Sequence, residues 1–229
     1  MHTLIFARAR WIVGVALLLG FAAMLRYPGG DPFDLSSAGY APTRNFLSDL
    51  GMTIAYNGQT NRFGASLFAA SLLVLIAGVG TILVGLVRHY SRRPRSRSFA
   101  RCAGAAGALA CAAFVVVAFT PENRVMALHV QATLLAWRLV PLASAFLTLA
   151  ALSADGVALR STIVLAGLTA VLAAYTAVLQ WGPSTSAMRG LQTDVIAQKI
   201  VALVLVCALV FLSLDAERAA ETGSSAAAK

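Results

Sequence analysis

Six long apolar runs, separated by shorter polar connections, dominate the sequence. They fall at about Ile5–Leu25, Phe63–Val87, Ala103–Phe119, Val125–Leu152, Ser161–Gln180 and Val195–Leu214. A helix needs about 20 apolar residues to cross the hydrocarbon core of a bilayer, and each run meets or nearly meets that length. The first run follows two arginines, as a signal peptide would, but it is longer than a typical signal and lacks a clear cleavage site. We therefore expect six membrane-spanning helices, with the first one retained.

One connection, from Tyr27 to Asn61, mixes apolar and polar side chains. Its centre reads Asn45-Phe46-Leu47-Ser48-Asp49-Leu50-Gly51, in which three side chains are too apolar for a solvated loop and three are too polar for a spanning helix. Such a segment belongs at a membrane interface. We expect the earlier stretch Pro28-Gly29-Gly30-Asp31-Pro32 to be neither helix nor strand. We expect a short helix through Leu50, capped by Thr43 or Asn45 and ended by Gly51. Because Leu47 and Leu50 flank Asp49, we expect its carboxylate to be buried and hydrogen-bonded within the loop or to the outer ends of the third and fourth helices.

Composition agrees with a membrane protein. The chain is 59% hydrophobic and 12% charged, with a mean hydropathy of +0.78, whereas soluble domains carry about 25% charged residues. The predicted fold class is an all-α polytopic integral membrane protein, with six transmembrane helices and a long structured outer loop between the first and the second. We expect one domain over residues 1–217 and a disordered cytoplasmic tail over 218–229, because the tail is rich in small and polar residues.

Arginine and lysine in the connections predict the orientation. One side of the membrane collects eleven of them: Arg8, Arg10, Arg88, Arg92, Arg93, Arg95, Arg97, Arg101, Arg160, Arg218 and Lys229. The other side has six: Arg26, Arg44, Arg62, Arg124, Arg189 and Lys199. The bias places both termini in the cytoplasm, beneath the plasma (inner) membrane. The Arg88–Arg101 loop is then a topology signal that attracts anionic lipid, and the net charge of +9 calls for no nucleic-acid partner.

Polar residues near the outer surface form one candidate site. The turn at Pro121 starts the fourth helix at Glu122, and His129 follows about two turns further along the same side. Topology brings the polar residues of the outer loop to the same level. The candidate outer polar pocket, which would hold a water, a cation or a lipid headgroup, comprises Asn45, Ser48, Asp49, Glu122 and His129.

Two further polar residues lie deeper in the fourth helix. Gln131 and Arg138 are seven positions apart and share nearly one face. An unpaired cation at membrane depth is costly, and no carboxylate lies deep in any run to pair with Arg138. We expect backbone carbonyls or hydroxyls to bind it, or a polar cavity that takes an anionic group. Lys199, near the outer end of the sixth run, is interpreted as a snorkelling anchor.

Several kinds of site are missing from the sequence. It has no glycine-rich phosphate loop after a strand, no paired cysteines and no two-histidine helix motif, so we expect neither a metal nor another cofactor. Zinc sites in helical membrane enzymes need several histidines, and the topology places His2 and His89 on the side opposite His129. The three cysteines are interpreted as buried small hydrophobic residues without a disulfide.

A resemblance rests on these motifs. Tyr-Pro-Gly at Tyr27, Asn-x-x-Ser-Asp-Leu-Gly from Asn45, Asn-Arg-Phe from Asn61 and the Pro121 turn before His129 resemble a bacterial family of six-helix membrane proteins of unknown function. That family is similar to the Frag/DRAM/Sfk group, whose members carry a comparable outer Ser-Asp loop. The resemblance covers about residues 27–152 and implies a role concerning membrane lipids and autophagy rather than a settled chemistry.

Three functions remain open. The favoured one is a non-catalytic membrane protein that binds or organises lipid, or serves as an accessory subunit beside membrane protein partners, with Ser48 and Asp49 fixing the outer loop. The alternative is a membrane-embedded hydrolase or transferase acting on a lipid headgroup, with Asp49 and His129 as acid–base groups or metal ligands and Ser48 as nucleophile. The third is a small-solute transporter, for which Arg138 is the only argument.

Overall fold

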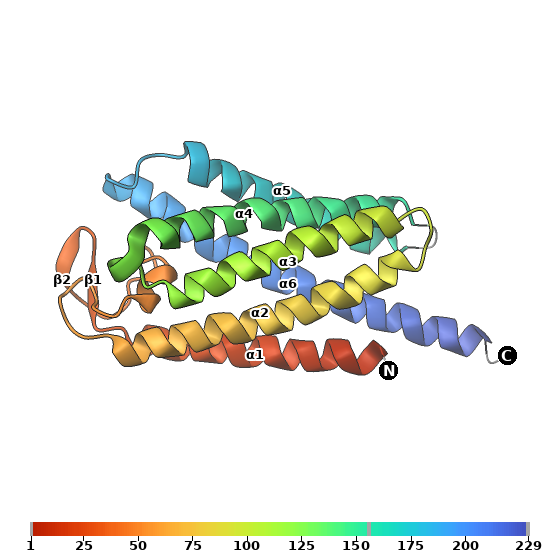
Figure 1. Cartoon of the computed structure of the whole chain (residues 1–229), viewed down its shortest axis with the longest axis horizontal. Helices are drawn as coiled ribbons and strands as arrows, with labels where there is room; N and C mark the ends of the chain where they lie inside the picture. The colour runs from red at the N-terminus through yellow and green to blue at the C-terminus, as the bar shows by residue number, and fades with distance from the viewer. Residues whose placement is uncertain (1, 155–156, 228–229) are drawn as a thin grey trace.

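The computed structural model describes residues 2–154 and 157–227, and in them six long helices form a bundle (Figure 1). Their bounds are α1 His2–Arg26, α2 Arg62–Ser91, α3 Arg97–Phe119, α4 Glu122–Leu152, α5 Leu159–Trp181 and α6 Met188–Ala227. Each of the six is long and apolar enough to cross a membrane. The predicted fold class, an all-α polytopic membrane protein, is confirmed.

The helices run side by side along the long axis of the molecule (Figure 1). Each helix packs on the next in sequence, and α6 closes the bundle by contacting α5, α1 and α2. Figure 1 places both chain termini at one end, here called the terminal end, and a small β-hairpin at the other, here called the cap end. The cap itself is residues 27–61, the connection between α1 and α2.

Glycines let α2 approach its neighbours closely, as its small-residue composition predicts. A Cβ atom at Gly78 would lie 2.8 Å from Val13 Cγ2 on α1, and one at Gly85 would lie 2.5 Å from the Phe6 ring. On α3, Gly107 leaves the space that Leu83 of α2 occupies. Van der Waals contact of this kind holds helices together where lipid offers no hydrophobic driving force.

The chain end differs from the prediction. Part of the tail expected to be disordered is helical, because α6 continues to Ala227; residues 228–229 lie outside the described part. The physical reason is in the sequence Ala-Glu-Arg-Ala-Ala-Glu from Ala216. Alanine, glutamate and arginine are strong helix formers, so they extend a helix that the membrane span has already nucleated.

The cysteines also differ in part from the prediction. All three are free thiols, as expected, but Cys102 and Cys207 are exposed on the surface of the bundle and Cys111 is half-buried. In a membrane the outside of the bundle is as apolar as its core, so a small apolar side chain gains little by facing inward. Hydrophobic sequence therefore did not predict burial here.

Polar contacts fasten the terminal end. Arg10 of α1 pairs with Glu217 of α6 at 2.8 Å and donates to Ser213 Oγ. Arg160 and the Ser161 hydroxyl, in the first turn of α5, both bind the buried Asp215 of α6. These contacts join α1 and α5 to α6 at the level where the apolar part of α6 ends.

Candidate functional site

The cap opens with a β-hairpin. β1 Gly29–Asp31 pairs antiparallel with β2 Asp34–Ala38, so the prediction of neither helix nor strand for this stretch is wrong. The two glycines have φ of 134° and 83°, a region that glycine enters without strain. A Cβ at Gly30 would lie 2.5 Å from the backbone nitrogen of Asn57. Glycines that suggested a chain break instead let β1 lie directly against the rest of the cap.

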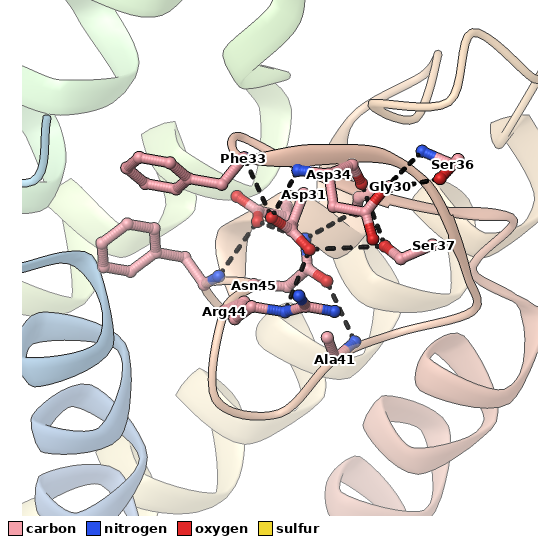
Figure 2. A network of polar contacts seen from close by, with 11 residues as sticks. Gly30, Asp31, Phe33, Asp34, Ser36, Ser37, Ala41, Arg44 and Asn45 are labelled. Carbon is pink, nitrogen blue, oxygen red and sulfur yellow. Dashed lines mark hydrogen bonds and ion pairs between the residues drawn. The ribbon is translucent and has the colours of Figure 1, made fainter. Parts of the chain in front are cut away.

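Asp31 organises the turn of this hairpin (Figure 2). Its side chain is fully buried. Oδ1 accepts the backbone N–H groups of Phe33 (2.9 Å) and Asp34 (3.0 Å), and Oδ2 pairs with Arg44 Nε at 3.1 Å. The Ser37 hydroxyl donates to Oδ2 as well. Sequence reasoning missed Asp31; the signal was a carboxylate just before a Pro-x-Asp turn, where such a side chain binds the backbone that follows it.

The centre of the cap, residues 45–51, contains one short 3-10 helix, η1 Ser48–Gly51. The predicted short helix is present and Gly51 ends it, but neither Thr43 nor Asn45 caps it, because the cap position is Leu47, which has no side-chain hydrogen bond to the helix. Leu50 is 1% exposed and packs against the end of α1. An apolar anchor thus holds η1 to the bundle.

Asn45 is the hub of the cap. Its Oδ1 accepts the Ala41 N–H, and its Nδ2 donates to Gly30 O and to Asp49 Oδ2, each at 3.0 Å. The side chain is 0% exposed. One amide therefore connects the hairpin, the loop before η1 and η1 itself.

Asp49 is fully buried and hydrogen-bonded within the cap, as predicted. Besides Asn45, the Phe46 N–H donates to Oδ2 at 3.0 Å, whereas Oδ1 has no hydrogen-bond partner among the described residues. Burial, and after it the negative charge of Glu122, raise the pKa of the Asp49 carboxyl to about 7. The two hydrogen bonds and the positive charge of Lys199 oppose this rise. Asp49 is thus a carboxyl that exchanges its proton near neutral pH.

Three phenols share this environment. Burial, followed by the Asp49 charge, raises the pKa of Tyr27, Tyr40 and Tyr56 above the ordinary value for tyrosine. The Tyr27 hydroxyl is buried, and a backbone contact from Tyr56 opposes the rise of its pKa. The interior of the cap therefore disfavours negative charge.

Helix α4 contributes His129 and Glu122 to this end. His129 is buried; its Nδ1 lies 2.6 Å from Thr120 O, and its Nε2 lies 4.0 Å from Glu122 Oε2. The first turn of α4 is not regular, because Val125 has non-helical angles (φ −138°, ψ 51°). This kink, which the sequence did not predict, changes the simple two-turn spacing from Glu122 to His129 while leaving the two side chains close.

The structure brings together some of the residues predicted to form an outer polar pocket. Asn45 and Asp49 are in direct contact, Glu122 acts on Asp49 electrostatically, and His129 lies beside Glu122. The Ser48 hydroxyl is half-buried and takes part in none of the hydrogen bonds described for this group. Among the described residues, no three His, Cys, Asp or Glu side chains converge to hold a metal ion.

Helix α6 supplies cap contacts that the sequence analysis missed. Gln198 Oε1 accepts the Leu47 N–H at 2.8 Å. Lys199 Nζ donates to Asn45 O at 2.7 Å and lies 5.4 Å from the centre of the Tyr40 ring. The interpretation of Lys199 as a snorkelling anchor is therefore wrong: its charge is directed into the protein. The signal was an adjacent pair of long polar side chains at the cap end of an apolar helix.

The two polar residues predicted deeper in α4 lie away from the cap. Gln131 and Arg138 are both exposed on the outside of the bundle. Arg138 donates through Nε (3.0 Å) and Nη2 (2.7 Å) to Gln180 Oε1 at the end of α5. The expectation of carbonyl or hydroxyl partners, or of a polar cavity, is corrected to this side-chain amide, which the sequence could not pair with Arg138 because the relative heights of α4 and α5 were unknown.

The fold and the cap define a class, a multi-pass α-helical membrane protein with a folded, buried polar cap at one end. No family model, no curated protein and no solved structure matches the chain.

Proposed function

We propose that the chain is a non-catalytic integral membrane protein that binds or organises membrane lipid, or serves as an accessory subunit of a membrane complex. In this proposal the cap lies outside the cell, and both termini lie in the cytoplasm beneath the plasma (inner) membrane. The excess of arginine and lysine in the connections on one side of the spans, eleven against six in the sequence, supports that orientation. The resemblance to the Frag/DRAM/Sfk group accords with a lipid-related role.

The observation that carries the non-catalytic part is where the polar side chains of the cap are directed. Asn45 binds backbone at two points, Asn61 Nδ2 donates to Leu50 O (3.1 Å) and Met52 O (2.9 Å), and Gln198 and Lys199 bind backbone of the cap from α6. Asn123 of α4 binds both the N–H and the hydroxyl of Thr53. Side chains used in this way hold the chain in one conformation, whereas an acid–base residue must present itself to a substrate.

The contacts of His129 support the same conclusion. A nucleophile needs a base within hydrogen-bond reach, but His129 Nδ1 lies 2.6 Å from Thr120 O and Nε2 faces Glu122 Oε2 at 4.0 Å, so both ring nitrogens face groups of the α3–α4 turn. The imidazole therefore holds the α3–α4 turn. In this proposal Ser48 and Asp49 fix the cap rather than perform chemistry.

A groove on the outside of the bundle supports the lipid part. It has a volume of about 730 Å³ and lies between α1, α2 and α3 in the half of the bundle toward the terminal end. Its lining is mostly apolar and includes Gly80, Gly104 and the charged Arg88. An apolar groove with a cation in its lining suits the acyl chain and the anionic headgroup of a lipid.

The test is lipid retention by the purified full-length protein, measured by mass spectrometry. Gly80→Leu adds a side chain to the groove, whereas Gly167→Leu adds one on α5 where nothing lies within 4 Å. We expect Gly80→Leu to lower the lipid-to-protein ratio severalfold and Gly167→Leu to leave it unchanged. If both variants retain lipid at the same ratio, the groove no longer supports the proposed lipid binding.

A second measurement distinguishes the non-catalytic proposal from the alternative of a hydrolase or transferase. The purified protein is incubated with phospholipid, and product is measured for wild type and for His129→Ala. Turnover by wild type that His129→Ala abolishes, in a variant that still folds, would replace this proposal with the hydrolase or transferase.

A further inference from the structure

A second cavity lies at the terminal end, between α2, α5 and α6. It has a volume of about 250 Å³ and is formed by the end of α2, the start of α5 and the last apolar turns of α6. Ligand sites for drug-sized molecules measure about 300–1,000 Å³, so this cavity fits a compact group. We call it the basic cavity.

The charged side chains that line the basic cavity are mostly cations. Three arginines and one carboxylate line it: Arg93, Arg160, Arg218 and Asp215. Asp215 is already bound by Arg160 and by the Ser161 hydroxyl. Arg93, in the turn after α2, and Arg218 on α6 bring further positive charge to the lining, and the Arg218 charge also acts on Asp215.

The end of α2 positions one of these cations. His89, in the last turn of α2, and Arg93, two residues after its end, both line the cavity. Arg93 Nη1 lies 3.1 Å from His89 Nε2, so the imidazole holds one side of the guanidinium while its remaining N–H groups stay available as donors. The turn after α2 is fixed in its place by the Ser96 hydroxyl, which donates to Tyr90 O at 2.7 Å.

The surroundings indicate what kind of anion the cavity takes. Leu86, Val157 and Leu212 line its apolar part, and the basic run from Arg88 to Arg101 begins beside it. In a six-span bundle this is the level of the lipid phosphates, and basic pockets between membrane helices bind anionic headgroups there. Arginine binds phosphate oxygens through paired N–H donors.

We infer that the basic cavity is a binding site for a phosphate group, the headgroup phosphate of an anionic lipid being its source in the membrane. The choice of lipid as the source rests on the proposed lipid-binding function. The site itself is separate from the groove on α1–α3 and from the cap. A soluble phosphate is the other source with the same chemistry.

The experiment compares single arginine variants of the full-length protein in neutral detergent. Bound phosphatidylglycerol and phosphatidylcholine are measured by native mass spectrometry, and the melting temperature is measured while inorganic phosphate is titrated. Arg93→Gln and Arg218→Gln remove cations from the cavity. Arg92→Gln is the matched control, since it removes the same charge from the same basic run at an exposed position outside the cavity.

We expect wild type to retain phosphatidylglycerol over phosphatidylcholine. Arg93→Gln should weaken that binding about tenfold, as the loss of a charge-assisted hydrogen bond does, while Arg92→Gln stays within about twofold of wild type, a difference too small for such a loss. If Arg93→Gln does not fold, Arg218→Gln, at an exposed position of α6, provides the same comparison.

The outcomes separate the two sources and the proposal from its failure. Retention of phosphatidylglycerol that depends on Arg93 assigns the site to lipid; stabilisation by inorganic phosphate that depends on Arg93, without lipid retention, assigns it to a soluble phosphate. Equal losses in Arg92→Gln and Arg93→Gln mean attraction by the basic run as a whole and overturn the site. The site is also overturned if wild type retains phosphatidylglycerol and phosphatidylcholine equally and its melting temperature does not respond to inorganic phosphate. Gly80→Leu tests the groove separately, so either result can fail alone.

Discussion

Replacing the buried carboxyl of the cap tests the energetics of this end most directly. In the unfolded chain Asp49 has the ordinary pKa of 3.8, and in the folded cap its pKa is about 7. Between these two values the unfolded chain has released the proton and the folded chain still holds it. The free energy of unfolding therefore falls as the pH rises from about 4 to about 7. Above pH 7 the folded protein bears the full cost of a buried negative charge.

The size of the effect follows from the same two values. At about 1.36 kcal/mol for each pH unit, the difference between 3.8 and about 7 corresponds to on the order of 4 kcal/mol. Asp49→Asn removes the charge but keeps an oxygen that can accept from Asn45 Nδ2 and the Phe46 N–H. We expect the variant to match wild type near pH 4 and to be more stable by about 1–4 kcal/mol at pH 8.

The assay is thermal unfolding of the purified protein in detergent from pH 4 to pH 8. For a chain of this size each kcal/mol moves the melting temperature by about 2–4 °C, so the gain at pH 8 is on the order of 10 °C. Asp49→Ala, which leaves two buried donors without an acceptor, should melt below wild type near pH 4 and below Asp49→Asn at every pH. Asp34→Asn is the control: hydrogen bonds from the Ser36 hydroxyl and N–H lower the pKa of Asp34, so its contribution is present above pH 4 and is lost as the pH falls. An Asp49→Asn protein that melts below wild type at pH 8 would refute the reasoning.

Three further predictions concern the cap, the outer surface and the orientation. Gln198→Leu and Lys199→Met should each lower the free energy of unfolding by about 1–2 kcal/mol, because each removes a hydrogen bond between α6 and the cap, and limited proteolysis should then cleave within residues 27–61 first. Arg138→Leu should leave the melting temperature within about 2 °C of wild type, a change below about 1 kcal/mol, since its only described partner is the exposed Gln180; a large loss would mean a buried role. A cysteine at Gln59, in a chain without the native cysteines, should react with an impermeant maleimide from outside the cell, and one at Ser98 only after permeabilisation; the reverse pattern would invert the proposed orientation.

Sequence reasoning predicted the helices well and the cap unevenly, for a physical reason. A membrane span depends on local composition, which any window of the sequence displays, whereas the cap is held by contacts between residues far apart in the chain. Asp49 was predicted to be buried because its own neighbours are apolar. Gln198 and Lys199 were missed because their partners, Leu47 N and Asn45 O, are backbone groups some 150 positions away that carry no sequence signal.

Polar residues have different roles at the two ends of α6, and this helix explains how the bundle specifies one arrangement. At the cap end Gln198 and Lys199 bind the connection between α1 and α2. At the terminal end Asp215 binds α5 and Glu217 binds α1. Between these levels α6 is apolar, and apolar contacts between helices compete with equally apolar lipid. Directional contacts at both ends therefore fix the height and rotation of α6 against its neighbours.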